Sequence, residues 1–191
     1  MSASEFTGMR KVTIRDTSTG NTGTFTVQGA DKIGSDGFMI ALESNEVTTS
    51  SFAGDTVSPN GTNLSAATLP LIPLSIDDIA AIFPEGYDST TGSWQPIIGG
   101  CTLNDVTFVF EKVCDTKGNI ILRHATVALA FELAISRDDT TIIELSIYPS
   151  LSLGSEYGLA GDLATEMIPY QIFDGVYDPT TDEVDFDVVP S

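Results

Sequence analysis

His124 is the only histidine of this 191-residue chain, and histidine is the side chain best suited to acid–base chemistry near neutral pH. It lies beside Arg123 in a segment of alternating apolar residues, and no serine or cysteine stands at the spacing of a known nucleophile motif. The sequence also contains no G-x-S-x-G, H-E-x-x-H or Walker segment. We therefore interpret His124 as a surface or sheet-packing histidine and predict that the chain is not an enzyme.

Oxygen ligands suited to calcium gather near the C-terminus. These residues are Asp178, Asp182, Asp185 and Asp187. Their spacing is not that of an EF-hand loop, and Asp185 and Asp187 alternate with apolar residues as on an edge strand with a charged outer face. The two cysteines, Cys101 and Cys114, fit no zinc pattern and are interpreted as free thiols. We expect no metal and no cofactor.

The charge of the chain is strongly negative and unevenly distributed. The formal net charge is −19, and all eight basic residues lie at or before Arg137. Such a surface repels the phosphates of nucleic acids, which argues against DNA binding. It is either a generic solubilising surface or one that must meet DNA without holding it. No apolar run approaches the roughly 20 residues that span a bilayer, and we expect no membrane partner.

The element that carries His124 is the most regular part of the sequence, from Asn119 to Leu151. Odd positions from Ile121 onward are large and apolar, whereas even positions are small or polar, which predicts a half-buried strand. A polar turn at 137–140 leads into a second alternating run, so we predict a long hairpin. A helix remains an alternative, because alanine and leucine are good helix formers. Glu132 and Glu144 fall on the small, non-core face.

The rest of the chain predicts a mainly β protein with one short α-helix at about residues 76–83. Ser75 is suited to cap this helix, Asp78 stands at the capping-box position, and Ile76, Ile79, Ala80 and Phe83 would share its buried face. Further strands are expected within 11–28, 38–43, 106–111 and 184–188, and we see no internal repeat. We expect a single domain over residues 1–191.

Residues 44–70 have no sustained period and are rich in Ser, Thr, Asn, Gly and Pro. We interpret this segment as a long loop, either flexible or serving as an interaction arm. Phe52, Val57 and Leu64 are scattered apolar residues that could anchor such an arm on a partner.

The order of several short motifs resembles the phage tail tube proteins (major tail proteins). The resemblance covers roughly residues 71–162. It rests on the run LIPLSIDDIAAIFP at 71–84, Ile97-Ile98-Gly99-Gly100, the long hairpin ending in Tyr148-Pro149, and the Gly-Leu-Ala-Gly-Asp stretch at 158–162.

This resemblance implies a β-sandwich or half-barrel with one flanking helix and a long assembly loop. Six copies would form a ring, and stacked rings would form a tube that conducts genome DNA without specific binding. The N-terminal arm 1–10, the loop 44–70 and the C-terminal segment 176–191 would bridge subunits or rings. Glu132 and Glu144 are the candidate lumen-facing residues. Implied partners are other copies of the chain and the tape measure, terminator and distal tail proteins. The implied location is the virion tail, after synthesis in the host cytoplasm.

Two other functions fit the sequence less closely. One is a different virion component, such as a capsid decoration, tail completion or baseplate protein. The other is a calcium- or carbohydrate-binding β-sandwich module, in which Trp94 would stack on a sugar ring.

Overall fold

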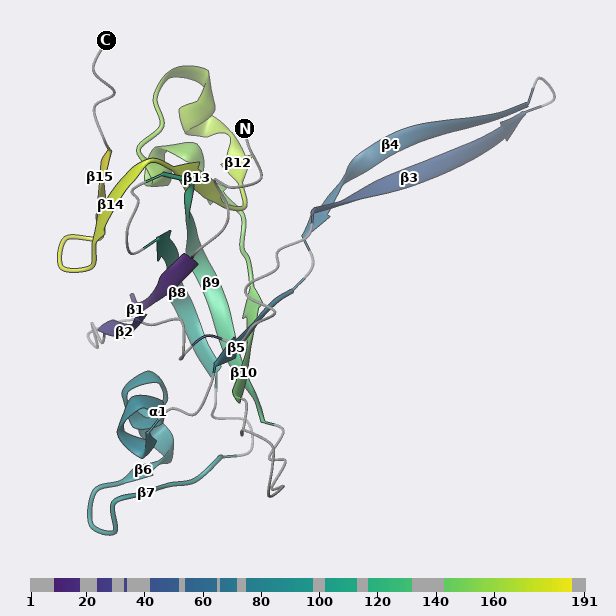
Figure 1. Cartoon of the computed structure of the whole chain (residues 1–191). Helices are drawn as coiled ribbons and strands as arrows, with labels where there is room; N and C mark the ends of the chain where they lie inside the picture. The colour runs from purple at the N-terminus through teal and green to yellow at the C-terminus, as the bar shows by residue number, and fades with distance from the viewer. Residues whose placement is uncertain are drawn as a thin grey trace.

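A computed structural model of the chain describes residues 9–17, 24–28, 33, 42–51, 54–64, 66–71, 75–97, 102–112, 117–131 and 143–186. The protein is mainly β, as predicted, with one antiparallel main sheet of seven strands and one α-helix among these residues (Figure 1). The strand order is β2-β1-β8-β9-β10-β5, and β13 also pairs with β9. These strands are β1 (Met9–Asp16), β2 (Thr24–Gln28), β5 (Ala67–Leu71), β8 (Thr102–Lys112), β9 (Asn119–Phe131), β10 (Ile143–Tyr148) and β13 (Gln171–Phe173).

The two predicted hairpins are present in the sheet. β1 pairs with β2 within the segment 11–28, and β9 pairs with β10 from Phe131 opposite Ile143 to Thr126 opposite Tyr148. The turn of the second hairpin, with Glu132, lies outside the described residues. The apolar face predicted for this hairpin is buried at Val127, Leu145 and Ile147. It packs into a core of apolar residues on one side of the sheet. That main core includes Val12, Ile14, Leu69, Leu71, Phe108, Phe110, Leu122 and Ala125.

The prediction of one continuous apolar face is wrong at the start of β9. Leu122, an even position, lies in the main core, whereas Ile121 lies in a second cluster with Val109. The register between β8 and β9 shifts twice, and the irregular residues Asp105 and His124 have positive φ angles of 62° and 53°. These are β-bulges, one in each strand, and each inserts a residue that reverses the alternation of the faces.

The second cluster covers only part of the other side of the sheet. It joins Val109 and Ile121 to three residues of the C-terminal region, Tyr157, Phe173 and Tyr177. That region consists of β11 (Ser152–Leu153), η3 (Gly154–Tyr157), η4 (Gly161–Thr165), β12 (Met167–Ile168), β13, β14 (Gly175–Asp178) and β15 (Glu183–Phe186). The predicted terminal strand is confirmed at 183–186. The described part of the segment 176–191 therefore packs on its own subunit through the buried Tyr177.

The helix α1 (Ile76–Ile82) lies at the lower end of the sheet in Figure 1. The predicted capping box is present, because Asp78 N donates to Ser75 Oγ and Ser75 N donates to the Asp78 carboxylate, both at 3.1 Å. The predicted buried face is wrong at Ile76, which is 49% exposed, and Ile82 is buried in its place. The helix meets the core with its C-terminal end, where Phe83 is also buried.

A short β-hairpin follows the helix. After the turn η2 (Pro84–Gly86), β6 (Tyr87–Asp88) pairs with β7 (Ser93–Trp94). Its turn, Tyr-Asp-Ser-Thr-Thr-Gly, matches Tyr-Asp-Pro-Thr-Thr-Asp between β14 and β15. The prediction of no internal repeat is therefore wrong for this short motif. In both turns the aspartate accepts from a threonine N–H at 2.8 Å, and the sixth residue, Gly92 or Asp182, has positive φ.

The predicted loop 44–70 is wrong as a structural assignment. β3 (Leu42–Ser51) and β4 (Gly54–Leu64) form an antiparallel hairpin, and β5 joins the main sheet. Of the strand expected at 38–43, residues 42 and 43 are described, and they belong to β3. The period-two alternation that marks a strand with one buried face is missing from the sequence of this segment. Among the described residues, β3 and β4 pair with each other and with no other strand.

Candidate assembly surfaces

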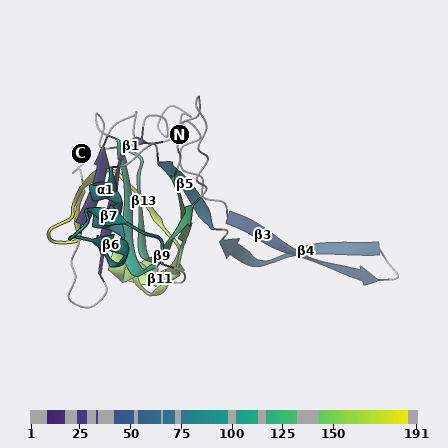
Figure 2. The same ribbon diagram turned by 90° about the horizontal axis from the view of Figure 1, so that it is seen from below.

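The β3–β4 hairpin reaches away from the body of the subunit (Figures 1 and 2). We call it the arm. Its strands have 10 and 11 residues, which at about 3.3 Å per residue gives an arm roughly 30 Å long. It forms its own two-stranded sheet, separate from the main sheet. An isolated two-stranded hairpin is at best marginally stable in water.

The arm has features that limit unwanted pairing. Pro59 lies within β4 and lacks the N–H that a ladder requires. The register shifts between Ser44 and Glu46, so that two residues of β4, Asn60 and Gly61, lie opposite the single residue Asn45 of β3. Val57 and Leu64, two of the predicted anchors, occupy β4 opposite Thr48 and Leu42, whereas Phe52 lies outside the described residues. The arm sequence contains three acids and no lysine or arginine.

The main sheet presents two outer strands, β2 and β5. Among the described residues, no strand pairs with the outer edge of β2, and β5 has a single bridge, from Leu71 to Ile33. Pro70 in β5 is a residue typical of edge strands. An unpaired edge exposes backbone donors and acceptors that a strand from another chain can pair with.

Below the bulges, the described residues on one face of the main sheet are exposed or half-buried, and we call this face the open face. Side chains directly opposite each other across strands share a face. Ser146 lies opposite both Ala128 and Thr68, Ala128 lies opposite Thr102, and Tyr148 lies opposite Thr126. All of these residues are exposed or half-buried. The open face comprises Thr68, Thr102, Thr126, Ala128, Glu144, Ser146 and Tyr148.

Glu144 is the one charged residue that we assign to the open face, and it is exposed. It lies opposite Ala130 on β9 and Pro70 on β5, so its neighbours across the strands are uncharged. The other predicted lumen residue, Glu132, lies outside the described residues. Apart from Tyr148, the open face therefore consists of small residues and one acidic residue.

The boundary of the open face is marked by His124, which is half exposed. Its Nδ1 lies 2.5 Å from Asp105 Oδ1, and its Nε2 lies 3.4 Å from Glu156 Oε2 on η3. The two bulge residues therefore contact each other across β8 and β9, and the imidazole also reaches the C-terminal region. Sequence reasoning missed this cluster because residues 105, 124 and 156 are far apart and no spacing pattern links them.

Above the bulges, an ion-pair hub holds the C-terminal hairpin on the sheet. Asp182 Oδ2 lies 3.0 Å from both Arg15 Nη1 and Arg123 Nη1, and Tyr177 Oη donates to Asp182 Oδ1 at 2.9 Å. The Arg123 guanidinium also donates to the Asp182 carbonyl and lies 5.8 Å from the Tyr157 ring. Burial, together with the neighbouring Asp182 carboxylate, raises the pKa of the Tyr177 hydroxyl, and burial raises that of Tyr157. These contacts join the β14–β15 hairpin to Arg15 on β1 and Arg123 on β9.

The residues proposed for ligand binding serve other contacts. Asp178 accepts from Thr180 N at 2.8 Å, which holds the pKa of its carboxyl below the ordinary value. With Asp182 engaged by two arginines, neither aspartate is placed as in a calcium loop. Trp94, which would stack on a sugar ring in the carbohydrate-binding alternative, is half-buried: it packs against the main core and donates its Nε1–H to the Phe83 carbonyl at 2.9 Å. Within the described ranges, no group of three or more His, Cys, Asp or Glu residues could hold a metal ion.

The helix α1 has seven residues, and no helix in the described part of the chain is long and apolar enough to cross a membrane. No protein-family model matches the chain, and no curated protein matches its sequence.

Proposed function

We propose that this chain is a structural subunit that assembles with copies of itself into rings that stack into a tube, the tail tube of a phage virion. The observation that carries the proposal is the arm, a polar hairpin about 30 Å long that leaves the body and, among the described strands, pairs with none outside itself. A hairpin of this kind gains stability when it packs on another subunit.

The main sheet supplies a second reason. Its outer strands β2 and β5 offer edges for pairing between neighbouring copies. Closing six such sheets into a ring would remove edges that otherwise invite aggregation. The ring number of six is part of the proposal and comes from the resemblance to tail tube proteins.

The open face supplies the third reason. In this arrangement it lines the channel, with uncharged residues that are small except for Tyr148, and with the exposed Glu144. An acidic wall repels the phosphates of DNA, so a genome passes without being held. The tape measure, terminator and distal tail proteins would contact the tube from within and at its ends.

The proposal is tested by negative-stain electron microscopy of the purified chain at increasing concentration. Tubes of uniform width support it. Isolated monomers, trimers or closed shells contradict it and favour another virion component.

A matched variant assigns the assembly to the arm. Residues 45–61 are replaced by a two-residue Asn-Gly turn, which keeps the ends of β3 and β4. We expect this variant to fold and to form no tubes. The control keeps the arm at full length and changes Thr48→Ser and Thr56→Ser, and it should assemble like the natural chain.

A further inference from the structure

The arm contains the only Asn-Gly dipeptide of the chain, Asn60-Gly61. In such a dipeptide the backbone nitrogen of the glycine can attack the side-chain carbonyl carbon of the asparagine and close a succinimide ring. The two groups belong to neighbouring residues, so the reaction is intramolecular, and glycine has no Cβ to hinder the approach. Ring closure also requires the asparagine to rotate about its backbone and side-chain bonds, so it depends on how firmly the fold holds the dipeptide.

The register of the arm places this dipeptide at its β-bulge. Asn60 and Gly61 together lie opposite the single residue Asn45 of β3. A bulge interrupts the ladder of backbone hydrogen bonds, and the preceding residue, Pro59, has no N–H to contribute to that ladder. The arm is a two-stranded sheet that extends away from the body (Figures 1 and 2), and among the described strands β4 pairs with β3 alone. The dipeptide therefore lacks the pairing on both sides that restrains a central strand of the main sheet.

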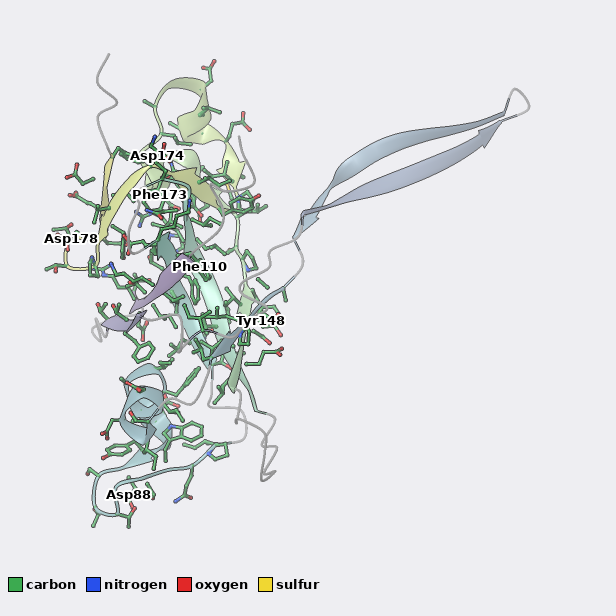
Figure 3. All side chains as sticks on the ribbon, in the orientation of Figure 1. Asp88, Phe110, Tyr148, Phe173, Asp174 and Asp178 are labelled. Atoms are coloured by element: carbon green, nitrogen blue, oxygen red, sulfur yellow. The ribbon has the colours of Figure 1, made fainter. Side chains whose placement is uncertain are left out.

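A second dipeptide shows how the fold can prevent the same reaction. Aspartate before glycine closes the same ring, and Asp174-Gly175 lies on the body among packed side chains (Figure 3). Asp174 accepts a hydrogen bond from Gly118 N at 2.8 Å, and Gly175 pairs with Phe186. A Cβ on Gly175 would lie 2.2 Å from the Asp185 carbonyl oxygen, so the backbone here is closely packed. These contacts restrain the dipeptide of the body, whereas the dipeptide of the arm lies away from the body.

We propose that Asn60 deamidates spontaneously in the free subunit and that the products weaken docking of the arm. Gly61 N bonds to Asn60 Cγ, and the amide nitrogen of Asn60 leaves as ammonia, taking up the proton of the Gly61 N–H. Water then opens the ring at either carbonyl and gives aspartate or isoaspartate.

Both products change the arm in the same direction. Each adds a negative charge to a segment that has three acids and no lysine or arginine, and isoaspartate also adds a methylene to the main chain at the bulge. Copies with a net charge of −19 already repel each other, so the added charge opposes docking. Deamidation is a property of the chain alone, whereas its effect on docking rests on the proposed function.

Peptide mapping by mass spectrometry tests deamidation in the natural chain, incubated at mildly alkaline pH and at a concentration too low for assembly. The peptide with Asn60 should gain the mass difference between a hydroxyl and an amino group and should separate into two products by chromatography. Asn45 and Asn63 of the same arm are internal controls and should remain amides, because large side chains follow them. Gly61→Ala should slow the conversion severalfold, and circular dichroism establishes that this variant folds.

Deamidation as proposed is overturned if Asn60 converts no faster than Asn45 and Asn63, or if the folded Gly61→Ala variant converts as fast as the natural chain. Isoaspartate that forms as readily at Asp174 as at residue 60 would overturn the role of the bulge, because position in the fold would then make no difference.

Assembly tests the effect on docking. Asn60→Asp has the charge of the products, and Asn60→Gln is the matched control that keeps the amide. Sedimentation over a concentration series should show that Asn60→Asp requires severalfold more protein to form tubes than the natural chain, whereas Asn60→Gln should assemble like the natural chain. Equal assembly of the two variants overturns the effect on docking. A natural chain that forms no tubes contradicts the proposed function and the effect on docking together, whereas the deamidation of Asn60 in the free chain is decided without tubes.

Discussion

Asp182→Asn is expected to loosen the C-terminal hairpin from the sheet. Asn is nearly the same size and tolerates the positive φ of 62° found at this position, so the turn itself is preserved. What is lost is the negative charge between Arg15 and Arg123, whose side chains are 16% and 12% exposed. Two guanidinium groups would then be left largely buried without their counterion.

The loss in the free energy of unfolding depends on which contacts the two arginines keep in the variant. Removing one partner of a buried ion pair costs about 3–5 kcal/mol. Arg123 keeps its hydrogen bond to the carbonyl of residue 182, and the amide oxygen of Asn can still accept one hydrogen bond. Asp182 is itself about one-fifth exposed, which weakens the pair further. We therefore expect a loss of about 2–3 kcal/mol in the free energy of unfolding.

Urea denaturation of the natural chain and the variant at neutral pH and low concentration measures this difference. Glu183→Gln is the matched control, since it removes the same charge from an adjacent exposed residue and should change stability by less than about 0.5 kcal/mol. If Asp182→Asn and the control are equally stable, the two arginines are not held by this carboxylate and the hub has no structural role.

Three further predictions follow from other contacts. Because the pKa of Tyr177 is raised in the folded chain, the unfolded chain loses the Tyr177 hydroxyl proton first as the pH rises past about 10, so the free energy of unfolding should fall above pH 10. Urea denaturation at pH 9 and pH 11 measures this fall, which should be smaller in Tyr177→Phe. Gly86→Ala should lower the free energy of unfolding by about 1–3 kcal/mol, because a Cβ at this position would lie 2.4 Å from the Gln95 carbonyl oxygen. Thermal melting checks this, and an unchanged melting temperature would show that the β6–β7 hairpin shifts to make room for the added methyl group. Glu144→Lys should leave the tubes intact but make them retain DNA in a co-sedimentation assay at low salt, whereas tubes of the control Glu144→Gln should not retain DNA. Equal retention of DNA by both variants would show that Glu144 does not face the channel.

The sequence predicted those parts of the fold that depend on interactions between residues close together in the chain. The capping box of Ser75 and Asp78 and the alternation of Val127, Leu145 and Ile147 each reflect a nearest-neighbour rule, and each is present. The bulges at Asp105 and His124 were not predictable in this way, because they depend on the register between two strands. Their effect is large, since they reverse the faces of β9 and thereby determine where the C-terminal region can cover the sheet.

The prediction of a loop in place of the arm is wrong for a different reason. Its Thr, Ser and Val residues are compatible with strands, but its sequence does not alternate between apolar and polar residues, so the segment 44–64 has the composition of a loop. The Asp182 hub and the His124 cluster join residues from distant parts of the chain, and only the folded sheet brings them together.

The measurement that tests the tube proposal most directly is electron microscopy of the natural chain beside the chain with the shortened arm, both at high concentration. We predict tubes of uniform width for the natural chain, with the open face on the inner wall, and folded but unassembled protein for the variant. Tubes from both chains would contradict the role of the arm, and the absence of tubes from the natural chain at any concentration would contradict the proposed function.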